Sequence, residues 1–246
     1  MQHRSKKIKK SFFIILVVLI VLSGGSVIYL GNYYHSVDVE KYMNGSSEVS
    51  VEKFDKGWFF DEAGEEKALI FYPGAKVATE AYAPLMYQLA ESGIDCFLVD
   101  MPFHMAFFGM NRAEEIMQEY NYEAWYLGGH SLGGAMAANF AADYVEDHTD
   151  GIRGLLLLAA YPTKDLSTSD MSVVTVYGSE DGVLNMDKIV AGRELMPQDY
   201  KEVCIEGGNH AQFGSYGTQK GDGTAAIPAE EQWARTVEVF VGDESE

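Results

Sequence analysis

The sequence predicts an α/β domain in which a mainly parallel β-sheet is covered by helices on both faces. Short apolar runs alternate with longer amphipathic segments from Glu48 onward. Most of these runs are continuously apolar, which is typical of strands buried on both faces of a parallel sheet. The chain has 246 residues, of which 47% are hydrophobic, enough to build the core of one sizeable domain.

The predicted elements follow one another in a regular order, and Gly or Pro residues separate several of them. Pro73-Gly74 ends the third strand, Gly93 stops the helix that follows, and Met101-Pro102 ends the fourth strand. The predicted strands cover residues 49–54, 58–61, 67–72, 95–100, 123–128, 152–160, 173–177 and 200–205. The predicted helices cover residues 80–92, 111–120, 132–146 and 229–241.

The N-terminal part has the pattern of a membrane anchor. Residues 1–11 form a basic tail, and residues 12–30 form an apolar stretch of about 19 residues, close to the roughly 20 that span a bilayer as a helix. Cations before the stretch and acids beyond it predict a cytoplasmic N-terminus and an extracytoplasmic domain. The alternative is a cleaved signal peptide, with an apolar core at 12–22 and small residues at 23–26 as the cleavage site. The protein is then secreted.

The rest of the chain divides into a linker and a folded domain. Residues 31–47 are largely polar and are predicted to be a tether. Residues 48–246 hold all the predicted strands and helices and form the folded domain. We therefore expect a single-pass protein of the cell membrane, or a secreted one if the N-terminus is cleaved.

The charge distribution argues against nucleic acid as a partner. The formal net charge is −19, and five of the 18 basic residues lie in the tail at 1–11. The remaining 13 basic residues face 37 acidic ones, which gives the rest of the chain a charge of −24. Such a surface repels phosphate backbones and anionic headgroups.

The two cysteines, Cys96 and Cys204, each lie within a short apolar run. We expect both to be buried core thiols on strands, while a disulfide between them stays open. No Cys or His spacing typical of a zinc site is present, and we expect neither a metal nor a cofactor. Asp222, on a glycine-rich loop, is at most a weak metal candidate.

A Gly-x-Ser-x-Gly tract lies between a predicted strand and a predicted helix. It reads Gly129-His130-Ser131-Leu132-Gly133, and this position is that of a nucleophile elbow, a tight turn that exposes the serine hydroxyl. The helix that starts at Leu132 directs backbone N–H groups to the place where an oxyanion would form. We interpret Ser131 as a nucleophile.

A serine nucleophile needs a base, and the base needs an orienting acid. His210 follows the last predicted strand, from which it can reach the elbow. Asp181 follows the penultimate strand, with Glu180 as the adjacent competitor. The chain order Ser, Asp, His is the order expected for such a triad on this fold. We read His130, inside the elbow, as a packing residue, and His104 as a minor candidate for substrate contact.

Three motifs together resemble the α/β-hydrolase superfamily, and in detail its compact bacterial "alpha/beta hydrolase family 5" branch. They are Gly-His-Ser-Leu-Gly-Gly, Gly-Ser-Glu-Asp-Gly-Val and Glu-Gly-Gly-Asn-His-Ala-Gln-Phe, each directly after a strand, and the resemblance covers about 67–241. It implies Ser131 as nucleophile, Asp181 as acid and His210 as base.

The resemblance also implies an oxyanion hole. The first donor is the amide of Leu132, and the second lies in the loop after the strand at 67–72. Tyr72-Pro73-Gly74-Ala75 stands where relatives often have His-Gly-x, which puts the second donor at the amide of Ala75. Because Pro73 replaces the His, Lys76 is the alternate donor.

These assignments predict a serine hydrolase that acts by acyl transfer. Between Ser131 and Asp181 there is space for a helix, a strand and a short connection at 162–171, so we expect no large lid domain. An open site suits a carboxylesterase for small or extended substrates, including cell-envelope esters. The alternatives are an amidase or peptidase, an envelope deacylase, or a non-catalytic exported scaffold. We expect the pocket rim at 213–224 and 103–110.

Overall fold

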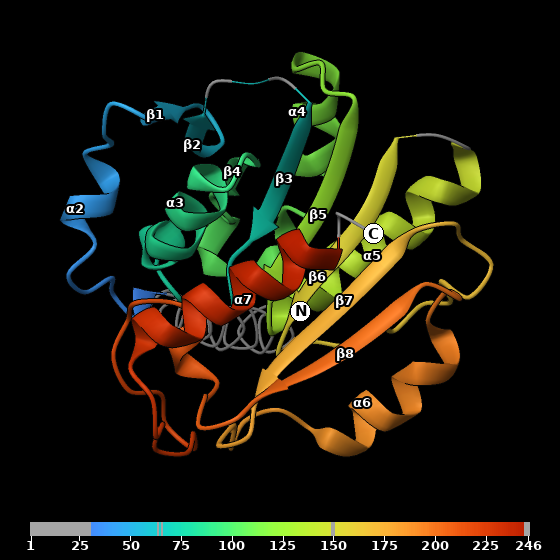
Figure 1. Cartoon of the computed structure of the whole chain (residues 1–246). Helices are drawn as coiled ribbons and strands as arrows, with labels where there is room; N and C mark the ends of the chain where they lie inside the picture. Colours follow the sequence, from blue (N-terminus) through green and yellow to red (C-terminus); the bar gives the residue numbers. More distant parts are fainter. Residues whose placement is uncertain (1–30, 63, 65, 149–150, 244–246) are drawn as a thin grey trace, which may run out of the picture. The chain divides into compact units, whose positions relative to one another are not determined.

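An eight-stranded sheet forms the centre of the structure, which is a computed structural model (Figure 1). It describes residues 31–62, 64, 66–148 and 151–243. The strands are β1 (Val49–Phe54), β2 (Gly57–Glu62), β3 (Lys67–Tyr72), β4 (Asp95–Val99), β5 (Ala124–His130), β6 (Ile152–Leu158), β7 (Ser172–Gly178) and β8 (Tyr200–Ile205). Their order in the sheet is β1-β2-β4-β3-β5-β6-β7-β8. Strand β2 runs antiparallel to both of its neighbours, and all pairs from β4 to β8 in this order are parallel.

Helices cover both faces of the sheet, as the sequence predicts. Helices α3 and α7 pack together over one face, while α4 and α5 cover the other. The α-helices are α2 (Glu40–Met43), α3 (Ala83–Glu91), α4 (Arg112–Glu119), α5 (Leu132–Asp147), α6 (Met186–Gly192) and α7 (Ala229–Asp243). Short 3-10 helices are η1 (Thr79–Tyr82), η2 (Pro102–His104), η3 (Ala106–Phe108), η4 (Arg193–Leu195) and η5 (Ala211–Phe213).

Alternate residues of the central strands pack into two separate cores. On β3, for example, Leu69 and Phe71 join the core under α3 and α7, whereas Ala68 and Ile70 join the core under α4 and α5. Successive side chains of a strand point to opposite faces, and both faces are covered, so every second position is apolar on each side. This explains why the strands have continuous apolar sequences, and it confirms the predicted α/β class.

Helix α6 and the segment before β1 differ from the sequence predictions. No helix is predicted over Met186–Gly192, because α6 is short and surface-exposed, with Val190 52% exposed. The predicted tether at 31–47 packs onto the domain from Tyr34 onward. The amide of Tyr34 donates to Lys76 O at 2.7 Å, Ala78 N donates to Tyr34 O at 2.8 Å, and Val39 is buried in the core. This segment is largely polar, but it contains apolar side chains such as Val39, and these side chains account for the packing.

The two cysteines also differ from each other. Cys96 is buried in β4, whereas Cys204 is exposed, so the prediction of two buried thiols is wrong for Cys204. The reason is that β8 lies at the edge of the sheet, and its residues are mostly half-buried or exposed. Both thiols are free.

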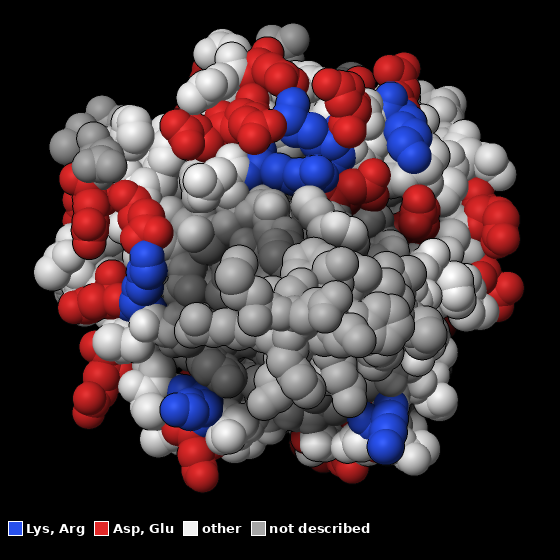
Figure 2. Space-filling model, turned by 180° about the vertical axis from the view of Figure 1, so that it is seen from behind, with Lys and Arg blue, Asp and Glu red and all other residues white. Residues whose placement is uncertain are grey.

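The chain divides into two units, Met1–Tyr33 and Tyr34–Glu246. The predicted membrane segment at 12–30 lies outside the described residues. Within the part that the structure describes, no helix has the length and apolar character to cross a membrane. On the face seen in Figure 2, the coloured side chains include more acidic than basic ones, which agrees with the overall charge of −19.

Candidate active site

Each of the four central strands is followed, at the same edge of the sheet, by a residue with a strained backbone conformation. Lys76 after β3, His104 after β4, Ser131 after β5 and Ala159 after β6 all have a positive φ, between 46° and 58°. These strands are neighbours in the order β4-β3-β5-β6. Such conformations are costly for residues with a side chain and cluster at functional sites. The carboxyl edge, where ligands bind in open α/β sheets, is therefore the candidate site.

Ser131 is the turn residue between β5 and α5. It has φ 54° and ψ −120°, and its amide donates to Leu158 O at 2.8 Å. The side chain lies at the N-terminus of α5, whose first amides have no acceptor within the helix. Leu132 is the first residue of that helix.

The glycines beside Ser131 are required by close backbone contacts. A Cβ atom on Gly129 would lie 2.6 Å from Gly133 C, and one on Gly133 would lie 2.1 Å from Tyr72 O. A Cβ atom on Gly134 would lie 2.5 Å from the side chain of Ala160. The elbow therefore has space only for glycine on both sides of the serine.

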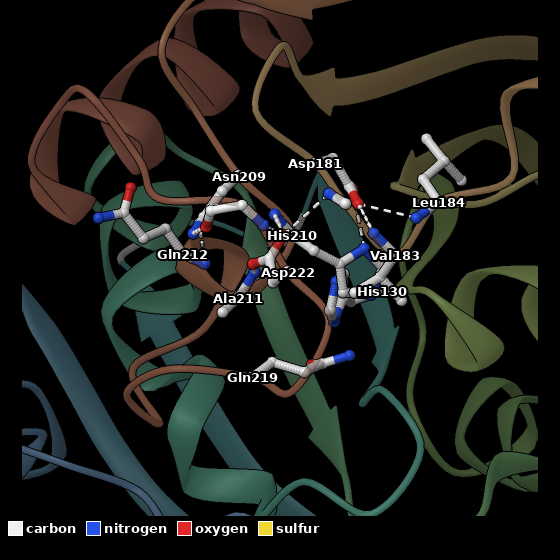
Figure 3. A network of polar contacts seen from close by, with 12 residues as sticks. His130, Asp181, Val183, Leu184, Asn209, His210, Ala211, Gln212, Gln219 and Asp222 are labelled. Carbon is white, nitrogen blue, oxygen red and sulfur yellow. Dashed lines mark hydrogen bonds and ion pairs between the residues drawn. The ribbon is translucent and has the colours of Figure 1, made fainter.

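The structure brings His210 and Asp181 together. His210 Nδ1 lies 2.8 Å from Asp181 Oδ2, and both side chains are only 2% exposed (Figure 3). Oδ1 of Asp181 accepts the amides of Val183 and Leu184, each at 2.8 Å. The adjacent Glu180 is exposed, and its carboxylate accepts the Ser179 hydroxyl instead. Asp181, and not Glu180, faces the histidine.

His130, the residue before Ser131, packs against His210. The ring centroids of His130 and His210 lie 4.4 Å apart, which places His210 beside the elbow. Nε2 of His210 is buried, and among the described residues it has no hydrogen-bond partner, the Ser131 hydroxyl included. Hydrogen bonds of a catalytic base are often long before substrate binds.

His130 has a bonding role that its sequence position does not reveal. Its Nδ1 lies 2.7 Å from the Tyr82 hydroxyl, which also accepts the amide of Gly74 at 3.0 Å. The Tyr82 proton is therefore donated to His130 Nδ1. Burial, and secondarily the nearby His210, lowers the pKa of His130 well below its ordinary value, so the ring is neutral, with its proton on Nε2.

The loop after β3 contains the predicted second oxyanion donor. The amide of Gly74 donates to Tyr82, and the amide of Lys76 donates to His104 O at 2.8 Å. The amides on either side of the Ala75 amide, those of Gly74 and Lys76, therefore already have acceptors within the fold. Ala75 itself is half-buried.

Asp222 lies against the His210–Asp181 pair, a position that sequence reasoning missed (Figure 3). Its carboxylate accepts backbone amides from the segments of both residues. Its oxygens are occupied by these amides, which argues against the weak metal role. Among the described residues, no group of three or more His, Cys, Asp or Glu could hold a metal ion.

The two predicted rims differ in character. Phe103, Phe107 and Phe108, after β4, are 58%, 47% and 53% exposed. In the other rim, Phe213 and Tyr216 are buried in the core. The loop beyond them borders an open cavity of about 470 Å³ together with Asn209 and Gln212. Only the phenylalanine rim presents a set of large apolar side chains to solvent.

The comparisons with known proteins agree with this fold. A family model described as "Alpha/beta hydrolase family" matches residues 68–234. An esterase of Pyrobaculum calidifontis has a TM-score of 0.60 at 14% identity, covering 84% of this chain and 88% of that one. Carboxyl esterase 2 of the fungus Tuber melanosporum has a TM-score of 0.59 at 12% identity, covering 85% and 89%.

A third solved structure is a fungal esterase from Rhizomucor miehei, with a TM-score of 0.55 at 15% identity, covering 83% of this chain and 86% of that one. At such identities the likeness establishes the fold. None of the curated protein sequences compared with this chain matches it.

Proposed function

Because the chain belongs to the alpha/beta hydrolase family, we propose that it is a serine hydrolase that transfers the acyl group of a carboxylic ester to water. The observation that carries this proposal is the buried hydrogen bond of 2.8 Å between His210 and Asp181, beside the strained turn of Ser131. Ser131 is the nucleophile, His210 the general base and Asp181 the acid that orients the base.

The proton moves through His210 in both half-reactions. The Asp181 carboxylate accepts a hydrogen bond from the Nδ1–H group of His210. The free lone pair of the imidazole is therefore on Nε2. Nε2 takes the proton of the Ser131 hydroxyl as Oγ attacks the carbonyl carbon, and it then gives that proton to the departing alcohol. In the second half-reaction His210 deprotonates water, whose oxygen attacks the acyl-enzyme ester, and the imidazolium returns the proton to Ser131 Oγ as the ester bond breaks and the acid is released. Asp181 stabilises the imidazolium in each step.

The developing oxyanion is held by the amides of Leu132 and Ala75. Leu132 N is at the start of α5, where the helix dipole favours negative charge. In the loop after β3, the amides of Gly74 and Lys76 already donate to Tyr82 and His104, which favours Ala75 over Lys76. Loss of one such donor typically lowers kcat by about 10²–10³-fold.

Small or extended esters fit the site better than long acyl chains. In the described residues between Ser131 and Asp181 the chain forms α5, β6, β7 and their connections, which leaves no large insertion there to build a tunnel. The similar structures named as esterases support ester chemistry. An amide or peptide preference, or envelope deacylation, uses the same triad and is separated by the substrate panel below.

We place the catalytic domain outside the cytoplasm, behind the apolar segment at 12–30. The sequence pattern of basic tail and apolar stretch supports this location. Extraction of membranes with alkaline carbonate tests it. Retention of the full-length chain supports an anchor, a shorter soluble chain supports a cleaved signal, and a full-length soluble chain contradicts both.

The function is tested by turnover of p-nitrophenyl acetate, butyrate and octanoate and of the matching anilides by the purified full chain. We expect ester turnover that is greatest for the short chains and is lost in Ser131→Ala and His210→Ala. Ser92→Ala is the matched control, because Ser92 Oγ donates to Gln88 O on helix α3, away from the catalytic edge. A folded wild-type chain with no turnover favours the scaffold alternative. Faster anilide turnover favours an amidase.

A further inference from the structure

We infer that Asp222 is a positioning residue for the catalytic pair: its carboxylate joins the turn that carries Asp181 to the loop that carries His210. This inference rests on the proposed function, because it concerns the same active site. Sequence position alone gives no hint of the role, since Asp222 is 41 residues from Asp181 and 12 from His210.

The carboxylate of Asp222 accepts amides from both segments. Oδ1 accepts His210 N at 3.2 Å, Gly182 N at 3.1 Å and Gly223 N at 2.9 Å, while Oδ2 accepts Ala211 N at 2.8 Å. Gly182 directly follows Asp181. One side chain therefore bonds the base itself, its neighbour, and the neighbour of the acid.

Close backbone packing holds the Asp222 loop in place. A Cβ atom on Gly223 would lie 2.0 Å from Glu180 O, and one on Gly182 would lie 2.6 Å from Gly221 O. The loop at 221–223 thus lies directly against the turn at 180–182. Substitution at either glycine would separate the two segments.

A second set of bonds fixes the His210 loop from the other side. The buried Gln232 of α7 accepts Asn209 N at 3.0 Å and donates to Asn209 O at 2.8 Å. Asn209 Nδ2 donates to Gly223 O at 2.8 Å. With the loop attached to α7 on one side, the Asp222 carboxylate helps to hold it against the turn of Asp181, together with the backbone bond from Glu180 N to Gly208 O at 2.8 Å.

The bonds of Asp222 are made to neutral backbone donors. None of the ion pairs between described residues involves Asp222. Hydrogen bonds to a charged acceptor are roughly twice as strong as neutral ones, so four amides on one carboxylate hold both segments firmly. A shift of about 1 Å between catalytic groups can lower turnover about a hundredfold.

Asp222→Ala and Asp222→Asn test the inference in the full chain, with Asp165→Ala as matched control. Asp165 also accepts an amide, that of Ser167 at 2.9 Å, but in the connection between β6 and β7. We expect kcat for p-nitrophenyl acetate to fall about a hundredfold in Asp222→Ala and about tenfold in Asp222→Asn, with KM within about twofold. Asn keeps one acceptor oxygen for His210, Gly182 and Gly223.

A proton NMR spectrum separates positioning from general loss of structure. In wild type the His210–Asp181 hydrogen bond should give a low-field proton resonance, and in folded Asp222→Ala this resonance should shift or broaden, while Asp165→Ala leaves it unchanged. If Asp222→Ala does not fold, Asp222→Asn decides by the same readouts. Wild-type kcat and an unshifted resonance in a folded Asp222 variant would overturn the inference alone. No turnover in wild type would overturn the proposed function as well.

Discussion

The two oxygens of the Asp181 carboxylate have different partners. Oδ2 lies 2.8 Å from His210 Nδ1, and Oδ1 accepts the amides of Val183 and Leu184. The backbone bonds fix the rotamer of Asp181, and that rotamer fixes the ring of His210. Asp181 thereby connects the turn after β7 to the loop after β8.

Asp181→Asn should lower kcat by roughly 10³–10⁴-fold with little change in fold. The Asn oxygen still accepts Val183 and Leu184, but its NH₂ group faces His210 Nδ1 and stabilises the tautomer whose Nε2 already carries a proton. Such a ring cannot take the proton of Ser131. Ester turnover measures the effect. Glu180→Gln is the control and should retain activity, and a larger loss in Glu180→Gln than in Asp181→Asn would reverse the assignment.

Tyr82→Phe should reduce both stability and turnover. The hydroxyl bridges Gly74 N and His130 Nδ1, so its removal leaves two buried polar groups unsatisfied, each costing about 1–3 kcal/mol of unfolding free energy. The loop that carries Ala75 and the ring beside His210 both lose a fixed partner. We expect kcat to fall while KM changes little.

Tyr122→Phe is the matched control for Tyr82→Phe. The Tyr122 hydroxyl donates to Asp95 Oδ2 at 2.6 Å, at the start of β4 and therefore at the amino edge of that strand. Denaturant unfolding should show a loss of stability in both variants, and ester assays a loss of turnover in Tyr82→Phe alone. Equal turnover in the two variants would contradict a role for Tyr82 in the active site.

Gly133→Ala should disrupt the elbow. The added Cβ would lie 2.1 Å from Tyr72 O and 2.4 Å from Pro73 O, so the backbone before Ala75 must move. Overpacking of this kind costs about 1–3 kcal/mol, and the displaced loop should abolish most turnover. On α7, Gly242 has no atom within 4 Å of an added Cβ, and Gly242→Ala should be neutral or stabilise by up to about 1 kcal/mol. Wild-type turnover in Gly133→Ala would contradict the geometry.

Glu202→Gln should lower stability in a pH-dependent way. Arg193 donates two bonds to Glu202, at 2.7 and 2.8 Å, and Tyr177 and Tyr200 donate one each. The Arg193 guanidinium holds the pKa of Glu202 below its ordinary value of 4.5. A depressed folded-state pKa means that the stabilisation is present above pH 4.5 and is lost as pH falls through the folded-state pKa.

At pH 7 we expect Glu202→Gln to cost about 1 kcal/mol of unfolding free energy, since Arg193 is half-exposed and screened by solvent. The difference from wild type should shrink as the pH is lowered below 4.5. Asp143→Asn, which breaks the exposed pair with Lys164, should change stability by less than about 0.5 kcal/mol. A Glu202→Gln difference that persists in acid would contradict the ionic origin.

Much of the fold can be predicted from the sequence because its signals are local. Continuous apolar runs identify β3 to β7, and the glycines around Ser131 identify the turn between β5 and α5. Cys204 and α6 are mispredicted because edge strands and short surface helices have weak apolar patterns. Val39 packs into the core from within a polar segment, a contact that depends on the tertiary fold.

The candidate site is predictable only in part, for a similar reason. Ser131, Asp181 and His210 each follow a strand, so strand order alone brings them to one edge. Tyr82 and Asp222 contact that edge from η1 and from a glycine-rich loop, and their roles depend on side-chain direction. The sequence position of His130 predicts only packing, whereas its bond to Tyr82 gives it a defined tautomer. No spacing rule in the sequence encodes these contacts.

Ser131 is proposed as a nucleophile activated by His210, and active-site labelling measures the reactivity of that serine itself. The full chain is treated with a fluorophosphonate, digested, and mapped by mass spectrometry, beside His210→Ala and Ser92→Ala. We expect a single modified peptide that carries the phosphonyl group on Ser131, normal labelling in Ser92→Ala, and labelling that is nearly lost in His210→Ala. Modification at another serine, or a folded wild-type chain that is not labelled, would contradict it.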